Sequence, residues 1–346
     1  MVQLTSKRYQ VNDLPEAIEL YFEKGWSDGL PVVPPTEEKI LAMLDASGLE
    51  PDQEITHIKD RRVSVTAEKV AINAVMAGCR PEYMPVVVAA VEAIGDPRWG
   101  YHGPGTSTGG AAVFMLVNGP IARELQINSG DNLFGPGWRA NATIGRAVRL
   151  VMRNGIGTLP GKLDRSTLGH PGKYTYVIAE DEADSPWPPV HVERGFRPDQ
   201  NVVTVVAAEA PHQFYNQLSS TAEGVLTTLC DDMRISGNVM GQPTYVLVLA
   251  GEHTRTISRS GWSKGDIRKF VFEHTQNSAA HLKRTQRMPG NVTPDDETAM
   301  RPLVASPEDI IVVAAGGKAG AFSAYIPGWG SRRNTEVVSK EIKRRR

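Results

Sequence analysis

The amino-acid sequence predicts an α/β or α+β protein in which mixed sheets and packed helices form two closely associated lobes. Short apolar segments typical of strands alternate loosely with amphipathic segments typical of helices along the chain. A length of 346 residues fits two packed lobes or one large domain with an appendage. Apolar residues make up 40% of the chain and charged residues 22%, which is the balance of a folded globular protein.

The same observations divide the chain into three parts. Residues 1–50 are expected to form an N-terminal helical and extended arm, because two helix candidates flank a stretch rich in glycine and proline. Residues 51–200 are expected to form a first α/β lobe carrying glycine- and asparagine-rich loops, and residues 201–346 a second α/β lobe. The residues show no clean internal repeat.

Individual elements follow from the period of the apolar residues and from the capping and turn residues around them. Helices are expected over residues 13–25, 37–46, 67–77, 80–94, 139–153, 221–233 and 263–281. Strands are expected over residues 63–65, 111–118, 174–179, 202–207, 245–250 and 310–314. The polar residues 283–305, which are interrupted by prolines and a glycine, predict a long surface loop.

Composition narrows the classes of function. Basic and acidic residues number 38 and 39, so no overall field favours nucleic acid or an anionic membrane surface. No segment approaches the about 20 apolar residues of a membrane-spanning helix, and no apolar run follows the N-terminal charges as it does in a signal peptide. Two cysteines without CxxC spacing and scattered histidines match neither a disulfide framework nor a recognisable metal site. We therefore expect a cytoplasmic protein without a metal.

A first candidate binding segment is the glycine-rich loop of residues 102–110. Glycines let backbone N–H groups approach a ligand closely, and three adjacent hydroxyl groups add donors for a phosphate or carboxylate. The loop matches neither a Walker loop nor a dinucleotide-binding fingerprint, so a glycine-rich turn before a strand is the alternative. Its candidate residues are the catalytic candidate His102 and the substrate-binding candidates Thr106, Ser107 and Thr108.

A second candidate segment, residues 128–141, is rich in carboxamides and turn residues and runs into a helix. Because a helix N-terminus favours anions, Asn132, Arg139 and Asn141 are expected to bind substrate. Arg146 lies seven residues after Arg139 and can share its helical face, although a surface salt bridge is an equal alternative.

Two further loops carry candidates. In residues 169–173, His170 can transfer protons near neutral pH and Lys173 can pair with an anion, whereas an ordinary turn is the alternative. After the apolar strand near residue 314, Lys318 and a run of glycines are placed where α/β folds commonly bind ligands, and a tight strand–helix connection is the alternative.

Cys79 is the third catalytic candidate. It lies between Gly78, expected to end one helix, and Arg80-Pro81, where the next begins. A thiol at a helix N-terminus beside an arginine has a stabilised thiolate, which suits a nucleophile. The alternative is a buried, unreactive thiol, as expected for Cys230 among its apolar neighbours.

Three stretches carry a resemblance to a known family. They are residues 25–36 (GWSDGLPVVPPT), residues 71–83 (AINAVMAGCRPEY), and residues 185–187 with 191–196 (SPW and HVERGF). Together they resemble chains of the UGSC family of selenoproteins and their cysteine-containing relatives, or the longer companion chain found with them. The family's name refers to a selenocysteine/cysteine-Gly-Ser-Cys motif, which this chain lacks, so no family residue is carried onto Cys79. The resemblance implies a small-molecule enzyme that can require a short thiol- or selenol-bearing partner.

These features together predict an enzyme subunit that acts on a small anionic polar substrate. The expected reaction forms or cleaves a carbon–heteroatom bond with thiol or selenol involvement, and no cofactor is predicted. A thiol-dependent oxidoreductase and a non-catalytic substrate-binding subunit of a two-component enzyme remain alternatives. A homo-oligomer is also left open.

Overall fold

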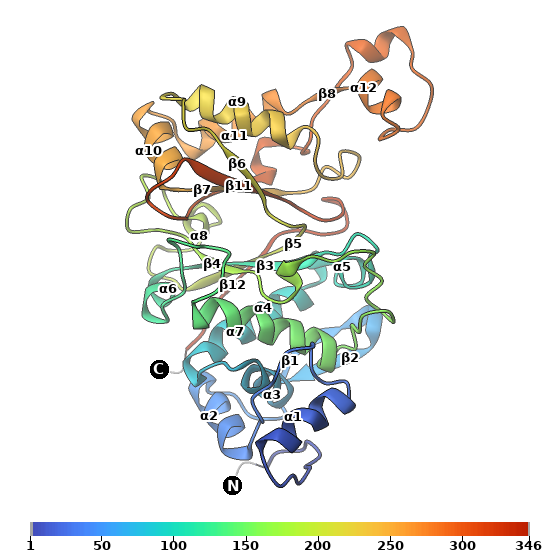
Figure 1. Ribbon diagram of the computed structural model, residues 1–346, viewed down its shortest axis with the longest axis vertical. Coiled ribbons are helices and arrows are strands. Elements are labelled where there is room, and N and C mark those ends of the chain that lie inside the picture. The colour runs from blue at the N-terminus through green and yellow to red at the C-terminus, as the bar shows by residue number, and fades with distance from the viewer. Residues whose placement is uncertain (1–2, 345–346) are drawn as a thin grey trace.

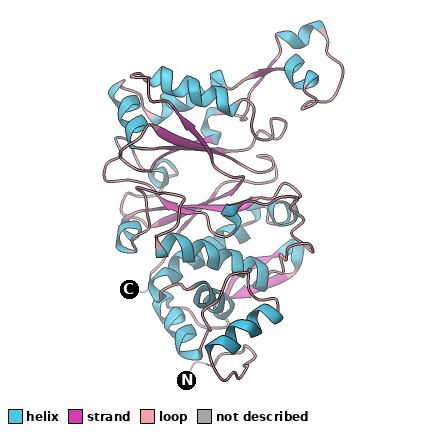
Figure 2. Ribbon diagram, in the orientation of Figure 1, coloured by secondary structure: helices cyan, strands magenta, loops and turns pink. Residues whose placement is uncertain are grey.

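In the computed structural model, which describes residues 3–344, two four-stranded sheets pack face to face between layers of helices (Figure 1). Figure 2 shows the strands of these two sheets in the middle of the molecule, and two shorter pairs of strands lie near the N-terminal end and in an arm at the opposite end. The mixed sheets and packed helices confirm the expected α/β or α+β class.

The two sheets have the same topology. The first has the order β12-β5-β3-β4 and consists of β12 (Val338–Glu341), β5 (Val202–Ala208), β3 (Ala112–Asn118) and β4 (Val177–Ala179). The second has the order β10-β7-β11-β6 and consists of β10 (Ile310–Ala314), β7 (Tyr245–Leu249), β11 (Phe322–Pro327) and β6 (His212–Tyr215). In each sheet two neighbouring strands are parallel, β3 with β4 and β7 with β10, and the other pairings are antiparallel.

The helices repeat with the strands. In the first half, α4 (Met84–Gly95) precedes β3 and α7 (Arg139–Leu150) connects β3 to β4; in the second, α9 (Ala222–Met233) precedes β7, and α10 (Gly251–Arg259) and α11 (Lys264–His274) connect β7 to β10. The last strand of each half crosses over, because β6 follows β5 but pairs in the second sheet, and β12 follows β11 but pairs in the first. The crossing segments meet at an antiparallel bridge between Ala208 and Gly328. The fold is therefore an internal repeat with exchanged strands, which the residues alone did not reveal.

The strands alternate between two cores, as the two-residue period of a strand requires. On β3, Phe114 and Leu116 pack against the facing sheet together with Val246 and Val248 of β7. Met115 of the same strand points into the core beneath α4 and α7. A third core joins the outer face of the second sheet to α9 and α11.

An additional layer covers α4 and α7 at the N-terminal end of the molecule (Figure 1). It consists of α1 (Leu14–Glu23), α2 (Glu37–Ser47), α3 (Ala67–Ala77) and the hairpin β1 (Glu54–Ile58)–β2 (Val63–Thr66). Asp13 caps α1 and Thr36 caps α2 by accepting backbone N–H groups of the first turn. The remaining short helices of the body are α5 (His102–Thr106), α6 (Pro120–Glu124) and α8 (Val190–Glu193).

Three expectations need correction. The single helix over residues 263–281 was wrong, because α11 ends at His274 and Ser278 caps a separate helix, α12 (Ala279–Arg284). The expected surface loop of residues 283–305 contains a helical turn (Pro294–Glu297) and β9 (Met300–Arg301), which pairs with β8 (Asn277–Ser278) in an arm that extends from the body (Figure 1). The boundary at residue 201 does not coincide with the sheets, since β5 and β12 both belong to the first.

Candidate functional site

The structure brings together the candidate loops of residues 102–110 and 169–173. The N–H of Thr167 donates to the carbonyl of Thr108, and Gly110 lies directly against Gly169. The Ser107 hydroxyl accepts the indole N–H of Trp329 at 2.9 Å. Two candidates lie at the start of this loop, where the Thr106 hydroxyl donates to the carbonyl of exposed His102 at 2.7 Å.

Lys173 belongs to a compact ionic cluster beside this loop. Its ammonium lies 2.7 and 3.0 Å from the two carboxylate oxygens of Asp164, which also pairs with Arg149. Burial favours the neutral carboxyl, but hydrogen bonds from Lys173 and Ser166 outweigh it and hold the pKa of Asp164 below its ordinary value. Both cations of the cluster are therefore engaged by one carboxylate, which leaves one net positive charge (2 − 1 = 1).

His170 is held in its neutral form by the same loop. Its Nδ1 accepts the N–H of Gly172 at 3.2 Å, so the proton lies on Nε2, which faces the carbonyl of Ala208 at 3.4 Å. Burial lowers the pKa of His170. At neutral pH the ring can accept a proton only by giving up the contact with Gly172.

The candidates on residues 128–146 bind backbone and side-chain groups of the chain itself. Arg139 donates twice to the carbonyl of Gly78 at the end of α3, at 2.9 and 3.1 Å. Arg146 forms a two-pronged ion pair with Asp28 at 2.8 Å and also reaches the carbonyls of Leu30 and Pro31. The remaining two are Asn141, which is buried and bonded to residues 128 and 177, and Asn132, whose amide donates to the carbonyl of Pro136.

Cys79 is buried, and its thiol donates to the carbonyl of Thr143 at 3.3 Å. Burial raises the pKa of Cys79 to about 12, and the nearby charges of Arg139 and Arg146 oppose this only in part. Burial also raises the pKa of Cys230 to about 12. Both thiols are thus protonated at neutral pH in this conformation.

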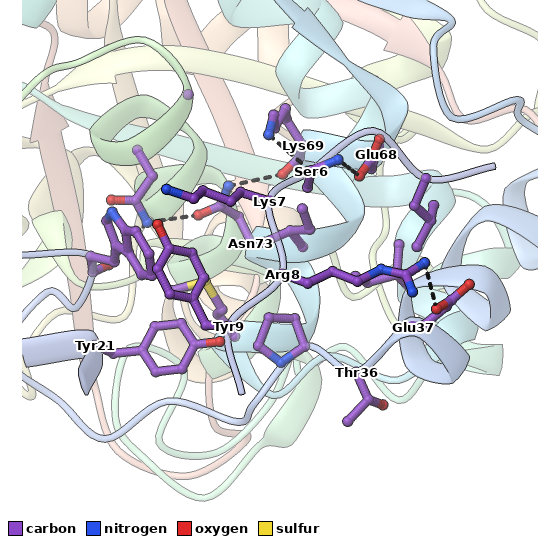
Figure 3. Close-up of a pocket in the computed structure, with 18 of the residues that line it drawn as sticks. Ser6, Lys7, Arg8, Tyr9, Tyr21, Thr36, Glu37, Glu68, Lys69 and Asn73 are labelled. Atoms are coloured by element: carbon purple, nitrogen blue, oxygen red, sulfur yellow. Dashed lines mark hydrogen bonds and ion pairs between the residues drawn. The ribbon is translucent and has the colours of Figure 1, made fainter. Parts of the chain in front are cut away.

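A cavity of about 500 Å³ lies outside the predicted loops, in the N-terminal layer. One side is formed by residues 4–9, named here the strap, which crosses over α3 (Figure 3). The remaining walls come from α1, from residues 26–40, from α3 and from the turn after α7. Its apolar and aromatic lining consists of Leu4, Tyr9, Leu20, Tyr21, Trp26, Pro35, Ile40, Ile72 and Met76.

The strap is fixed to α3 by one buried carboxylate. Glu68 accepts the N–H groups of Thr5 and Ser6 at 2.9 and 2.8 Å and the hydroxyl of Thr5 at 2.8 Å. Figure 3 shows Ser6, Glu68 and Lys69 on one side of the strap and the Arg8–Glu37 ion pair on another. The rings of Tyr9, Tyr21 and Trp26 meet edge to face nearby, so the strap has both polar and aromatic anchors.

The charges around the cavity do not cancel. Three cations, Lys7, Arg8 and Lys69, and two carboxylates, Glu37 and Glu68, line it, which leaves one positive charge (3 − 2 = 1). Arg8 pairs with Glu37, and Glu68 is occupied by the strap backbone. Lys69 donates to the hydroxyl of Ser6, and the ammonium of Lys7 lies 5.6 Å from the ring centre of Tyr9, so these two lysines together carry the excess charge.

The sequence analysis did not identify this cavity. Its walls come from five separate segments of the chain, and only their packing brings the cations and the aromatic rings into one cavity. The available signal was the concentration of Tyr9, Tyr21 and Trp26 within the first 26 residues, close to Lys7 and Arg8.

Membrane-spanning helices, metal sites and similarity to known proteins were also considered. Within residues 3–344, no helix is long and apolar enough to cross a bilayer. Over the same residues, no group of three or more His, Cys, Asp or Glu side chains is placed to hold a metal ion. No protein-family model and no curated protein matches this chain. The choice of a candidate site therefore rests on the geometry of the residues alone.

Proposed function

We propose that this chain is the substrate-binding subunit of a small-molecule enzyme, and that it binds a compact organic monoanion in the cavity beneath the strap. The observation that carries the proposal is the cavity itself, whose apolar and aromatic walls surround one uncompensated positive charge. Its volume of about 500 Å³ falls within the range typical of small-molecule sites. A ligand with an apolar body and a single carboxylate matches both properties.

The arrangement of the walls suggests how such a ligand is held. Trp26, Ile72 and Met76 can contact its body, since each lines the cavity. Lys7 can meet the carboxylate, because Glu37 and Glu68 are already engaged with Arg8 and with the strap. A ligand with an ammonium group would find no free carboxylate to pair with among the described residues of the site. Electrostatics therefore favours an anion.

The assignment of a binding rather than a nucleophilic role rests on the two thiols. Cys79 and Cys230 are both buried, with pKa values raised to about 12, so neither supports thiolate chemistry at neutral pH. If the carbon–heteroatom or redox chemistry proposed from the sequence takes place, its reactive thiol or selenol is better assigned to a partner chain. The resemblance to the UGSC family is consistent with such a two-component enzyme and remains a proposal.

Three probes of nearly equal shape test the charge preference. Isothermal titration calorimetry with benzoate, benzamide and benzylamine compares an anion, a neutral amide and a cation on the same ring. We expect benzoate to bind most tightly and benzylammonium most weakly. Binding that does not depend on the charge of the probe would contradict the proposal.

The variant Lys7→Met tests the residue assigned to the charge. We expect benzoate affinity to fall by about tenfold or more, because a hydrogen bond to a charged group contributes about 1.5–3 kcal/mol. Lys24→Met is the matched control, since Lys24 also lies near the ring of Tyr9, at 5.9 Å, but does not line the cavity. Equal losses in both variants would point to the general surface charge instead.

A further inference from the structure

A second cleft, of about 300 Å³, lies at the carboxyl ends of the parallel strands β7 and β10. It is separate from the cavity beneath the strap, and the two share no lining residue. The carboxyl edge of parallel strands is where open α/β sheets commonly bind ligands. Its walls consist of Asp181, Asp184, Ser185, Leu249, Gly251, Thr254, Arg255, Ala314, Ala315, Gly316 and Lys318.

The internal repeat identifies what occupies the equivalent place in the first half. The last parallel pairs are Val117 with Ala179 in the first sheet and Leu249 with Ala314 in the second. Counting two residues beyond Val117 and Leu249 matches Gly119 with Gly251. Counting three residues beyond the second strand matches Glu182 with Gly317.

In the first half, side-chain carboxylates fill this place. The N–H of Gly119 donates to the carboxylate of Glu182 at 2.7 Å. The amide of Asn118 donates to Glu182 at 2.9 Å and to Glu180 at 2.8 Å. The carboxyl edge of the first sheet is thus closed by acids of the chain itself.

In the second half, the equivalent positions carry no such side chains. The N–H of Gly251 donates to the backbone carbonyl of Gly317 at 3.0 Å. Ala315 stands where the first half has Glu180, and Gly317 where it has Glu182. The carboxylate of Asp131 lies against Gly317 and takes part of the space that Glu182 fills in the first half, and the cleft lies beside it.

The charged residues of the cleft also favour a ligand that carries a positively charged group. Lys318 pairs with Asp184, and both side chains are largely exposed. This leaves one cation, Arg255, which donates to the carbonyl of Lys318 at 2.7 Å, and one acid, Asp181. Burial and the neighbouring Asp184 raise the pKa of Asp181, so an added cation near its carboxylate would be stabilising.

We infer that this cleft binds a small zwitterion of the amino-acid class, with its carboxylate toward Arg255 and its ammonium toward Asp181. The inference uses the cleft volume, its place at the carboxyl ends of β7 and β10, and the four charged side chains that line it. It is independent of the monoanion site beneath the strap, because the lining residues differ.

Calorimetry on the full chain with L-alanine, propionate and ethylamine tests both ends of the ligand. Propionate lacks the ammonium group and ethylamine lacks the carboxylate, whereas the carbon skeleton is nearly unchanged. We expect L-alanine to bind about tenfold more tightly than either, as expected when each charged contact contributes separately. Propionate binding as tightly as L-alanine would overturn the zwitterion assignment, and so would a lack of L-alanine binding at millimolar concentration.

Two charge-removing variants locate the ligand. Arg255→Gln and Asp181→Asn should each weaken L-alanine binding about tenfold. Arg259→Gln is the matched control, because Arg259 is exposed on the same helix, four residues further on, and does not line the cleft. Unchanged melting temperatures would show that the variants fold. Equal affinity of Arg255→Gln and Arg259→Gln for L-alanine would show that the ligand does not bind in this cleft.

Discussion

The two halves of the molecule share one topology but differ at the carboxyl edges of their sheets. In the first half, the buried carboxylate of Glu180 accepts the ammonium of Lys264 at 3.0 Å, and Glu182 covers the N–H of Gly119. In the second half, Ala315 and Gly317 leave a cleft at the equivalent place. The backbone therefore sets where a ligand edge can be, and the side chains decide whether it is open.

A second difference lies on the outer helical faces. The first half carries the additional layer of α1, α2 and α3, which holds the cavity beneath the strap. In the second half, α9, α10 and α11 correspond to α4 and α7, the helices that the additional layer covers in the first half (Figure 1). The cavity beneath the strap thus lies in the additional layer of the first half, whereas the cleft lies at the carboxyl edge of the second sheet, and the charged residues that line them differ.

Removing the buried cation of the first edge should have the largest effect. In the pair Lys264–Glu180 the side chains are 2% and 0% exposed, so Lys264→Met leaves a buried carboxylate unpaired and should cost about 3–5 kcal/mol of unfolding free energy. The matched control at the second edge is Lys318→Met, whose pair with Asp184 is 73% and 56% exposed and should contribute at most about 1 kcal/mol. Urea unfolding measures both changes. Similar losses would contradict the contrast between the two edges.

Weakening the attachment of the additional layer to the first half should give the next largest loss of unfolding free energy. Arg146 of α7 holds Asp28 and two backbone carbonyls of residues 30–31. Arg146→Ala removes these contacts from a nearly buried carboxylate and should destabilise the fold by about 2–3 kcal/mol. Arg139→Ala, on the same helix, removes only contacts to one exposed carbonyl and should cost about 1 kcal/mol. A larger loss for Arg139→Ala, measured by urea unfolding, would contradict this ranking.

The arginines also show why the sequence predicted the candidates but not their partners. The charge and helical spacing of Arg139 and Arg146 were visible in the sequence. Their acceptors, however, lie 61 and 118 residues away. Whether an arginine meets a ligand or the chain's own backbone depends on long-range packing, which neither spacing nor composition reports.

The predicted helices and strands show the same limit: apolar elements were predicted, and elements held by tertiary contacts were missed. The apolar strands β3, β5, β7 and β10 were expected because burial on both faces requires continuous apolar residues. The edge strand β6, with the sequence HQFY and one buried residue, and the polar helix α10 were missed. Their stability comes from tertiary contacts, such as the buried Ile257 of α10, rather than from a long apolar pattern.

The ionic cluster of Asp164 should make the first half sensitive to acid. The folded-state pKa of Asp164 is lower than the unfolded value, so its contribution is complete above that unfolded value and is lost as the pH falls below about 4. Asp164→Asn should destabilise the protein by about 1.5 kcal/mol at pH 7 and change stability less at pH 3. Asp199→Asn is the control, since Asp199 is exposed and pairs only with the neighbouring Arg197. Parallel pH profiles for the wild type and Asp164→Asn would contradict the assignment.

The smallest contrast between the halves concerns their two thiols, Cys79 at the start of the α4 region and Cys230 on α9. Burial raises both pKa values to about 12, so both thiols stay protonated in the folded state from pH 5 to pH 9. We expect iodoacetamide to label both slowly and at similar rates from pH 5 to pH 9, as measured by peptide mass spectrometry. In urea both should react rapidly, which controls for the reagent. Labelling of Cys79 many times faster than Cys230 in the folded protein would contradict the binding role. It would show that Cys79 forms a thiolate despite its burial and can act as the nucleophile.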